Sequence, residues 1–517
     1  MANKNLFASI AGALIPKTDA LNSEHAPAYK LAPKQALAQY AATGCFGRTF
    51  YATAKEQLDQ VLELCETVEP EFVARIAIYS RTQSFMKDMP ALLCAWLASR
   101  DARLHEAVFA RVIDNTRMLR NYVQILRSGV TGRKSLGSAP KRLVREWLAS
   151  RDEEALFTTS VGQSPSFSDI VKMVHPKPAG SRREAFYGYM LGRPYDAAAL
   201  PELIAQFERF KAGESVDVPA LPFTMLSALP LSKSDWAAIA KNASWQTTRM
   251  NLNTFARHGV FEDAALVQQI AGRLKSAEEI TRARVFPYQL LAAYQNCDAA
   301  VPQQVKDALQ DAMEIAIANV PQIEGSVVVC PDVSGSMVSP VTGYRSGSTT
   351  SVRCIDVAAL VAAAVVRKNA TALVLPFEQT VVSVKLNPYD TVMANAARLA
   401  SLGGGGTNCS APIAQLNWQK VNADLVIFIS DNQSWVDAGR GRGTALMEEW
   451  SKFCQRNPKA RLVCLDIQPE QTTQAVERED ILNIGGFSDQ VFEVIAAFAS
   501  GQLEADHWVA RIEAVAA

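Results

Sequence analysis

The segment Ser326-Val-Val-Val-Cys-Pro-Asp-Val-Ser-Gly-Ser336 joins a short apolar run to a group of oxygen-bearing side chains. Runs of this kind, rich in β-branched residues, are typical of buried strands in a parallel sheet. Three similar runs follow, at Ala372–Phe377, Asp424–Ser430 and Arg461–Ile467. Helical patterns separate or follow them, over Ile355–Asn369, Ala411–Gln419, Ala445–Gln455 and Ser488–Ser500. Strand–helix alternation predicts an α/β doubly wound domain, which we assign to residues 323–517.

Oxygen-bearing side chains follow the predicted strands, where ligands of such sheets bind. The first group comes directly after the first strand, a second position follows a run of four glycines, and a third ends the strand at residue 430. Mg²⁺ is a hard cation that requires oxygen ligands, so these positions predict a divalent metal site. The predicted ligands are Asp332, Ser334, Ser336, Thr407 and Asp431.

This set resembles the metal-ion-dependent adhesion site of von Willebrand factor type A domains, whose pattern is DxSxS, then a threonine, then an aspartate. The alternative is that Asp332, Ser334 and Ser336 form only a turn and a helix cap, which these residue types also favour. We expect a binding site without catalytic residues, since no GxSxG or HExxH motif occurs and no Gly-Lys-Ser/Thr follows the glycine run. The protein is therefore not expected to be an enzyme.

The first three fifths of the chain predict an α-helical domain over residues 1–322. Apolar residues recur at helical spacing in Gln57–Cys65, Glu71–Ser80, Pro90–Ser99, His105–Ile113, Arg142–Ser150, Leu200–Phe210 and Ala264–Leu274. Short amphipathic helices in series must stack to bury their apolar faces, as helical repeats do.

The formal net charge of zero conceals an uneven distribution of charge. The 52 basic and 52 acidic residues divide as 37 and 32 before residue 323, and as 15 and 20 after it. Residues 111–145 hold nine basic residues, and their only acid is Asp114. The glycine- and serine-rich stretch Ser128–Arg142 is predicted to be a flexible loop, which could follow a phosphate backbone. The predicted RNA contacts here are Arg117, Arg120, Arg127, Arg133, Lys134, Lys141 and Arg142, the alternative being a solvated basic face.

The cysteines and the apolar segments indicate in which cellular compartment the protein is expected. The nine cysteines are odd in number and form no CxxC pair, so neither a disulfide scaffold nor a zinc ribbon is expected. The most apolar window, Val357–Val366, is too short to cross a bilayer, and no secretory signal is visible. We expect a cytoplasmic protein without a membrane partner.

The order of the two domains resembles the Ro autoantigen family, whose members carry a TROVE domain. The most specific passages are Pro331-Asp-Val-Ser-Gly-Ser-Met337, Gly404-Gly-Gly-Thr-Asn-Cys-Ser-Ala-Pro412 and Ile429-Ser-Asp-Asn-Gln-Ser434. Gly129–Leu148, Arg282-Ala-Arg-Val-Phe-Pro-Tyr-Gln289 and Ser166-Phe-Ser-Asp-Ile-Val-Lys-Met-Val-His-Pro-Lys-Pro178 are also similar to the family.

The resemblance implies a monomeric, closed ring of HEAT-like repeats followed by the von Willebrand-type domain. It also implies a ribonucleoprotein that binds small noncoding Y-like RNAs and single-stranded 3′ ends of misfolded RNAs. Bacterial members work in RNA quality control beside a 3′-to-5′ exoribonuclease, and His175 matches a position that contacts Y RNA. The alternative function is a metal-dependent protein-interaction module in which the helices form a protein-binding solenoid.

Overall fold

The computed structural model describes residues 15–43, 46, 48–161, 165–283, 285, 287–318, 320–341, 344, 352–438, 443–486, 490–501 and 507–516. The chain divides into two compact units, each described here by itself. The first comprises Met1–Thr67, Ile280–Asn296 and Leu309–Arg511. The second comprises Val68–Glu279, Cys297–Ala308 and Ile512–Ala517.

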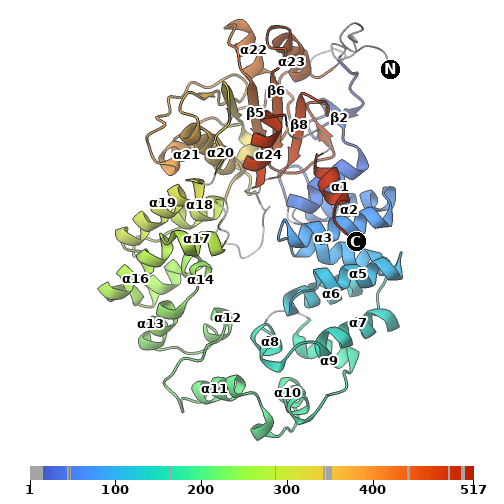
Figure 1. The fold of residues 1–517 in the computed structure, drawn as a ribbon, viewed down its shortest axis with the longest axis vertical. Coiled ribbons are helices and arrows are strands. Elements are labelled where there is room, and N and C mark those ends of the chain that lie inside the picture. The colour runs from blue at the N-terminus through green and yellow to red at the C-terminus, as the bar shows by residue number, and fades with distance from the viewer. Residues whose placement is uncertain are drawn as a thin grey trace. The chain divides into compact units, whose positions relative to one another are not determined.

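The first unit is built on a five-stranded sheet of order β4-β3-β5-β6-β8 (Figure 1), in which every neighbouring pair is parallel. The strands are β3 (Val327–Pro331), β4 (Leu373–Val374), β5 (Leu425–Ser430), β6 (Arg461–Asp466) and β8 (Ile481–Gly485). All four predicted strands are present. The second is shorter than the predicted Ala372–Phe377 because Pro376 has no N–H for a ladder hydrogen bond.

Helices cover both faces of this sheet. Alternate residues of β3 and β5, such as Val328 and Phe428, pack in one core with Trp450 and Phe453 of α23 (Ala445–Arg456) and with Leu416 of α22 (Ala411–Trp418). Helix α20 (Cys354–Lys368) packs against β3, β4 and β5 and is buried along nearly its whole length. The remaining helices with residues in this unit are α1 (Pro33–Thr43), α2 (Ala54–Thr67), α17 (Ala277–Ala283), α18 (Pro287–Gln295), α19 (Gln303–Ala318), α21 (Val392–Ala400), α24 (Gln490–Ala499) and α25 (His507–Glu513).

A second, three-stranded sheet belongs to the same unit and was not predicted. Its order is β1-β2-β7, with antiparallel pairs formed by β1 (Ala20–Leu21), β2 (Pro27–Lys30) and β7 (Thr472–Thr473). Strands of two to four residues are too short for an alternating pattern to be recognised in the sequence. The pairing places the N-terminal residues within the unit that carries the parallel sheet, although they were assigned to the helical domain.

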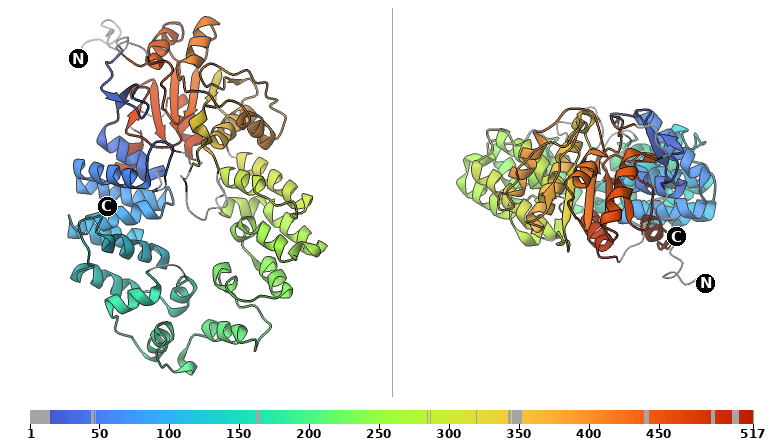
Figure 2. Two further views of the ribbon diagram at one scale, coloured as in Figure 1. Left: turned by 180° about the vertical axis from the view of Figure 1, so that it is seen from behind. Right: turned by 90° about the horizontal axis from the view of Figure 1, so that it is seen from above.

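The second unit contains only helices among its described elements, as predicted. Successive helices pack side by side, as seen from behind in Figure 2, with contacts joining α3 to α4 and α5, α4 to α6, and α7 to α9. Side-chain caps fix where several helices begin: Asp101 accepts the N–H of Leu104, and Ser166 forms a capping box with Asp169. The α-helices are α3 (Pro70–Thr82), α4 (Asp88–Leu97), α5 (Ala102–Val112), α6 (Thr116–Ser128), α7 (Ser138–Ala149), α8 (Glu153–Thr158), α9 (Phe167–Val174), α10 (Ser181–Leu191), α11 (Glu202–Lys211), α12 (Phe223–Leu226), α13 (Lys233–Asn242), α14 (Trp245–Met250), α15 (Leu252–Arg257) and α16 (Ala264–Leu274).

The predicted loop Ser128–Arg142 is shorter in the structure. It spans residues 129–137, because α6 ends at Ser128 and α7 already begins at Ser138. Glycines bound it at both ends, where the backbone turns with φ of 92° at Gly129 and 73° at Gly137. Lys141 and Arg142, which we expected in the loop, therefore project from α7.

Two further observations concern the sequence expectations on cysteines and membranes. The eight cysteines of the described segments, all but Cys45, carry free thiols. In the part of the chain that the structure describes, none of the helices combines the length and the apolar character needed to span a bilayer.

We expect Trp450→Ala to lower the free energy of unfolding of the first unit by about 3–5 kcal/mol, because truncating a fully buried aromatic side chain leaves a cavity. The matched control is Trp418→Ala, since Trp418 is 82% exposed on the neighbouring helix α22 and its truncation should cost less than about 0.5 kcal/mol. Urea denaturation followed by circular dichroism measures both. Equal losses in the two variants would contradict this account of the core.

Candidate metal centre and basic surface

The predicted metal ligands lie at the point where the order of strands in the parallel sheet reverses. Strand β3 lies between β4 and β5, so the connection that leaves β3 runs to one side of the sheet and the later connection returns on the other. Crevices at such points, beyond the carboxyl ends of the strands, are the usual ligand sites of doubly wound sheets. Asp332 directly follows β3 and Asp431 directly follows β5; the last pair between these two strands is Pro331 with Ile429.

Hydrogen bonds fix the orientation of the Asp332 carboxylate. One oxygen, Oδ1, accepts the backbone N–H of Ser334 at 2.8 Å, and Oδ2 accepts the hydroxyl of Ser430 at 2.6 Å. The hydroxyls of Ser334 and Ser336 lie 3.3 Å apart. Ser334 precedes a short 3₁₀ helix over Gly335–Val338 but does not cap it with its side chain. The loop thus contains the turn of the alternative interpretation, but the serine hydroxyl does not serve as a cap.

The glycine run packs against this loop backbone to backbone. The N–H of Gly335 donates to the carbonyl of Gly405 at 2.8 Å, and the N–H of Gly404 donates to the carbonyl of Val333 at 3.0 Å. Gly403 adopts a φ of 80°, and a Cβ there would lie 2.0 Å from the Val333 oxygen, so only glycine fits.

Thr407 is held from the other side by the loop that follows β5. Its carbonyl accepts the N–H groups of Trp435 and Val436, both at 3.1 Å. All five predicted ligands are less than 8% exposed. The structure therefore brings the three predicted loops together at one edge of the sheet.

The two carboxylates of the site lie in an environment that disfavours their charge. Burial, followed by the negative charge of Asp431, raises the pKa of Asp332 from 3.8 to about 7. Burial also raises the pKa of Asp431, although hydrogen bonds from Ser336 and Gln433 oppose this shift. Neither carboxylate forms an ion pair with a described Lys or Arg side chain. A bound cation would supply the missing positive charge.

The donor set fits a hard divalent cation. Within the described segments, no three His, Cys, Asp or Glu side chains converge as a metal-binding group. A cation at this edge would therefore need hydroxyl oxygens in addition to the two carboxylates. Oxygen donors of this kind suit Mg²⁺, which also retains bound water. Ser430 was missed as a member of the site, although its place between a buried strand and Asp431 was a usable signal.

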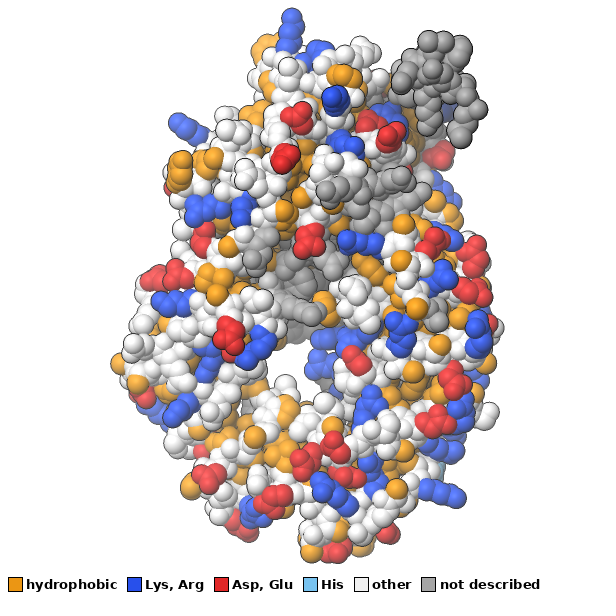
Figure 3. Space-filling model, viewed as in Figure 1, with side chains coloured by type: hydrophobic (Ala, Val, Ile, Leu, Met, Phe, Trp, Pro, Cys, Tyr) orange, Lys and Arg blue, Asp and Glu red, His pale blue; other side chains and the backbone are white. Residues whose placement is uncertain are grey.

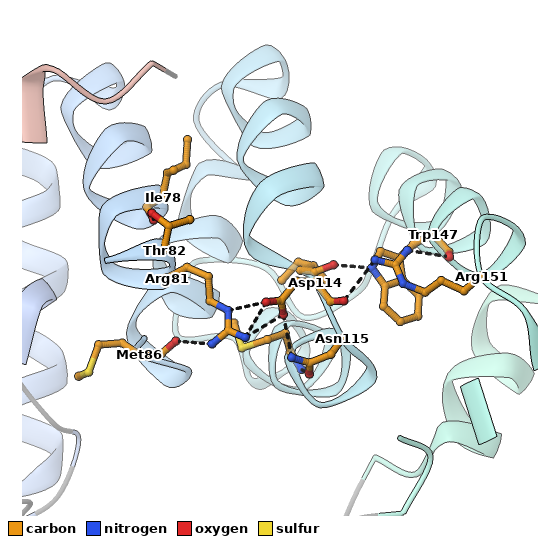
Figure 4. Close-up of polar contacts among 10 residues, drawn as sticks. Ile78, Arg81, Thr82, Met86, Asp114, Asn115, Trp147 and Arg151 are labelled. Carbon is orange, nitrogen blue, oxygen red and sulfur yellow. Dashed lines mark hydrogen bonds and ion pairs between the residues drawn. The ribbon is translucent and has the colours of Figure 1, made fainter. Parts of the chain in front are cut away.

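Some of the basic side chains predicted to contact RNA are paired within the protein, and others are available to bind a phosphate. The only acid of the basic stretch, Asp114, is bound by Nε and Nη2 of the Arg81 side chain, with a closest approach of 2.6 Å (Figure 4). Arg151 stacks 3.8 Å over the Trp147 ring and donates to backbone carbonyls of Asp114 and Trp147. Asp114 therefore does not compete for the other cations of the stretch.

Three of the predicted RNA contacts are engaged within the protein. Arg142 forms ion pairs with Glu106 at 2.8 Å and with Glu146 at 3.0 Å. Arg133 donates to the carbonyl of Ala98 at 2.6 Å. Arg120 is 7% exposed, which leaves its guanidinium little contact with solvent.

Four others are available to a ligand. Among the described residues, the side chains of Arg117, Lys134 and Lys141 form no hydrogen bond or ion pair, and Arg127 contacts only the sulfur of Met173, at 3.5 Å. In the space-filling view, Lys and Arg side chains are interspersed with Asp and Glu side chains (Figure 3). The accessible basic surface is consequently smaller than the sequence suggested.

His175 lies close to the end of this basic stretch. It caps α9 in the left-handed conformation, with φ of 51°, and its side chain is exposed. Arg145 of α7 donates to the carbonyl of the preceding residue, Val174, at 2.5 Å. His175 also lines an open pocket of about 520 Å³, together with Lys172, Glu184, Tyr187 and Arg193. The structure thus brings Arg127 and His175 into one neighbourhood.

Aromatic side chains can stack on unpaired RNA bases, but four aromatic residues of the helical unit at or near the basic stretch are largely core residues. Tyr122 is fully buried and shares a 2.8 Å hydrogen bond with His105. Phe167 is 1% exposed. Tyr189 donates its hydroxyl proton to Glu208 at 2.7 Å. Of this group, Tyr187 borders the open pocket, although its own side chain is buried.

Comparisons with known proteins match both parts of the chain. The family model for the Ro60 vWA domain matches residues 326–499, and that for the TROVE domain matches residues 167–341. A protein of Deinococcus radiodurans named "RNA-binding protein RO60" is 25% identical over 97% of this chain and 100% of its own length. A protein of the same name from Caenorhabditis elegans is 24% identical over 47% of this chain and 38% of its own length.

A solved structure shares the fold. The crystal structure of the Deinococcus radiodurans Ro (Rsr) protein superposes with a TM-score of 0.64 and 21% sequence identity. The match covers 91% of this chain and 100% of that one. It extends the agreement in fold over nearly the whole sequence.

The buried carboxylates predict an unusual dependence of stability on pH. The raised pKa means that the folded protein binds a proton at Asp332 more tightly than the unfolded chain does. Metal-free protein should therefore lose stability as the pH rises from about 4 through 7, at up to about 1.4 kcal/mol per pH unit. In chelator at pH 8, Asp332→Asn should melt at a higher temperature than wild type, and at pH 4 this difference should vanish.

Asp424→Asn is the control of opposite sign. Hydrogen bonds from Ser326 lower the pKa of the exposed Asp424, so this variant should gain no stability at pH 8. Thermal melts monitored by circular dichroism test both variants. A difference between Asp332→Asn and wild type that is the same at pH 4 and pH 8 would contradict the proposed electrostatics.

Proposed function

Because the chain belongs to the Ro family of TROVE-domain proteins, we propose that it is an RNA-binding scaffold of the Ro type. The observation that carries this proposal is the full-length similarity to a protein named for RNA binding, together with the two family domains in one chain. A scaffold of this kind binds and presents RNA and performs no chemistry on it.

RNA binding requires cations that are not already paired within the protein. Arg117, Arg127, Lys134 and Lys141 meet this requirement, and they lie on or between α6 and α7. Each cation that neutralises a phosphate releases a counterion, which makes the affinity fall with salt. The pocket beside His175 adds Lys172 and Arg193 to the same region of the helical unit.

We further propose the finer role that the family resemblance implies. The RNAs are Y-like small noncoding RNAs and misfolded RNAs with single-stranded 3′ ends. The protein works as a monomer in the cytoplasm, in RNA quality control or processing, and a 3′-to-5′ exoribonuclease is the expected enzymatic partner. The exposed position of His175 beside available cations supports a contact with such an RNA.

For the first unit we propose that Asp332, Ser334, Ser336, Thr407 and Asp431 hold Mg²⁺. When bound, the metal supplies a coordination position that an acidic group can fill. The chain's own contribution is to hold its two carboxylates and three hydroxyl side chains at one edge of the sheet, away from competing cationic side chains.

A second candidate function is metal-dependent capture of a protein partner. It is favoured by Trp435 and Val436, which are 43% and 38% exposed. Their backbone N–H groups donate to the carbonyl of the predicted ligand Thr407. Exposed apolar side chains beside a metal site suit a protein ligand better than a nucleic acid. A pull-down that loses its partners in chelator but keeps them after nuclease treatment would favour this function over RNA binding.

The RNA proposal predicts which cations matter. Replacing Arg117, Arg127, Lys134 and Lys141 together by glutamine should weaken binding to a hairpin RNA with a single-stranded 3′ tail. It should also reduce the slope of log affinity against log salt by about 3, since each single-strand phosphate contact contributes roughly 0.7. Filter binding or fluorescence anisotropy at several salt concentrations measures both quantities.

The control is the double variant Arg142→Gln/Glu106→Gln, which removes a paired cation together with its partner and leaves the net charge unchanged. It should retain the wild-type slope. Removing the 3′ tail from the RNA should weaken binding to wild-type protein. Affinity that responds neither to salt nor to the tail would contradict the proposed function.

The metal proposal predicts that Mg²⁺ raises the melting temperature of wild-type protein at pH 7.5. It also predicts that Thr407→Val weakens Mg²⁺ binding, because valine preserves the shape of threonine but offers no oxygen. Ser401→Ala is the control, since the Ser401 hydroxyl bonds only to the carbonyl of Arg398. Isothermal titration calorimetry with MgCl₂ gives the affinities. Equal affinities in Thr407→Val and Ser401→Ala would count against Thr407 as a ligand.

RNA cleavage that needs Mg²⁺ and is lost in Asp332→Ala would show that the site is catalytic.

A further inference from the structure

In the helical unit, an exposed histidine ring stacks on a buried tryptophan. The imidazole of His258 lies nearly parallel to the indole of Trp236, with ring centroids 4.1 Å apart and an angle of 11° between the two planes. Trp236 belongs to α13 and is 5% exposed, whereas His258 directly follows α15 and is exposed. The indole therefore covers one face of the imidazole, and the other face is open to solvent.

The tryptophan beneath the histidine is anchored in an aromatic core. Its ring packs against Phe223 of α12, with 5.9 Å between the ring centroids, and Phe223 in turn contacts Phe255 of α15 at 6.2 Å. Phe255 is fully buried, so these rings join three helices of the unit. Because Trp236 is fixed by this packing, the orientation of His258 is set before a ligand arrives. Such preorganisation lowers the entropy cost of binding.

The acidic side chains that follow the histidine are engaged within the protein. Gly259 turns the chain with a φ of 72°, and a Cβ there would lie 2.7 Å from Oε1 of Glu262. Glu262 forms an ion pair with Lys233, and Asp263 caps the N-terminus of α16 with its side chain. Negative charge beside the exposed ring is thus partly neutralised, which reduces the repulsion of an RNA phosphate.

The residue before the histidine supplies an available cation. Arg257 is exposed, and among the described residues its side chain bonds only to the hydroxyl of Thr254, at 3.2 Å. The ring nitrogens of His258 form no hydrogen bond within the described segments. Proteins hold single-stranded nucleic acid with aromatic faces that stack on bases and with cations that contact phosphates. Arg257 and His258 provide one group of each kind.

We infer that the outer face of His258 is a stacking platform for an unpaired RNA base, and that Arg257 contacts a phosphate of the same strand. This inference rests on the RNA binding proposed above and adds a base contact that the cations of α6 and α7 do not supply. Tyr122 and Phe167, near those cations, are buried and cannot stack on a base.

A platform of this kind recognises whether a base is unpaired and not which base it is. Every base has a π-face, so stacking tolerates any sequence. Bases within a duplex already stack on their neighbours and leave no face for the imidazole. The platform consequently favours single-stranded segments of an RNA over its paired segments.

The test compares two RNAs that share one hairpin and differ only in the 3′ tail. One tail carries bases, and the other is an abasic ribose-phosphate chain of equal length, so both offer the same phosphates. Full-length wild-type protein should bind the base-bearing RNA about tenfold more tightly, since one base–aromatic stack contributes on this scale. Fluorescence anisotropy at fixed salt gives both affinities.

The variants separate stacking from charge. His258→Ala should bind the two RNAs equally, whereas His258→Phe should keep the preference within about threefold of wild type, because a phenyl ring can stack on Trp236 and on the base. Arg257→Gln should keep the preference and reduce the slope of log affinity against log salt by about 0.7. Tyr389→Ala removes a tyrosine that is 86% exposed in the other unit and should behave as wild type.

The preference for the base-bearing tail is a ratio measured on one variant, so partial unfolding, which lowers both affinities together, does not mimic its loss. If His258→Ala keeps the wild-type preference, or His258→Phe loses it as alanine does, the platform is refuted and RNA binding stands. The same holds if wild type binds both RNAs equally. An unchanged salt slope in Arg257→Gln overturns the phosphate contact. If wild type binds neither RNA, the proposed function and the inference both fail.

Discussion

The parallel pairing of β3 with β5 forces two buried carboxylates together, and the rest of the site follows from this constraint. Because Pro331 is paired with Ile429, Asp332, which comes next after Pro331, and Asp431, which follows Ser430, leave the sheet at adjacent points of the same edge. Both are almost fully buried, burial raises the pKa of each, and the charge of Asp431 raises the pKa of Asp332 further. Such an arrangement persists in a folded protein when a cation or a proton offsets it.

The surrounding loops are built to hold the two carboxylates in place. The glycine run approaches the Val333 backbone so closely that no side chain fits at Gly403, and this contact brings Thr407 to the site. The turn Asn22–Ala26 between β1 and β2 is fastened to Gln433 and Ser434 on the opposite side. Residues from four separate parts of the sequence therefore depend on one pair of strand ends. In the helical unit, ion pairs such as Arg142 with Glu106 occupy some of the basic side chains. Only part of the basic stretch is therefore available to bind RNA phosphates.

The sequence predicted the parts of this structure whose signals are local and periodic. Apolar runs such as Asp424–Ser430 and the oxygen-bearing residues after them were sufficient to predict the sheet and to place the five predicted ligands at its edge. The sequence could not predict which basic side chains are paired. Arg133, Lys134 and Arg142 are all basic residues of the same stretch, and only folding brings partners to Arg133 and Arg142. Nor could the sequence show that Asn22 and Ser23 bond to Ser434 and Gln433, which lie 412 and 410 positions away, since short strands carry no periodic signal.

The central claim is that the carboxylates of Asp332 and Asp431 share a divalent cation with the neighbouring hydroxyls. The most direct measurement is a crystal structure of the full chain grown with Mn²⁺, with an anomalous difference map calculated at the manganese edge. The account predicts a peak at ligand distance from Asp332, Ser334 and Ser336, beyond the ends of β3 and β5. A map in which manganese is absent from this edge, or bound only elsewhere, would contradict it.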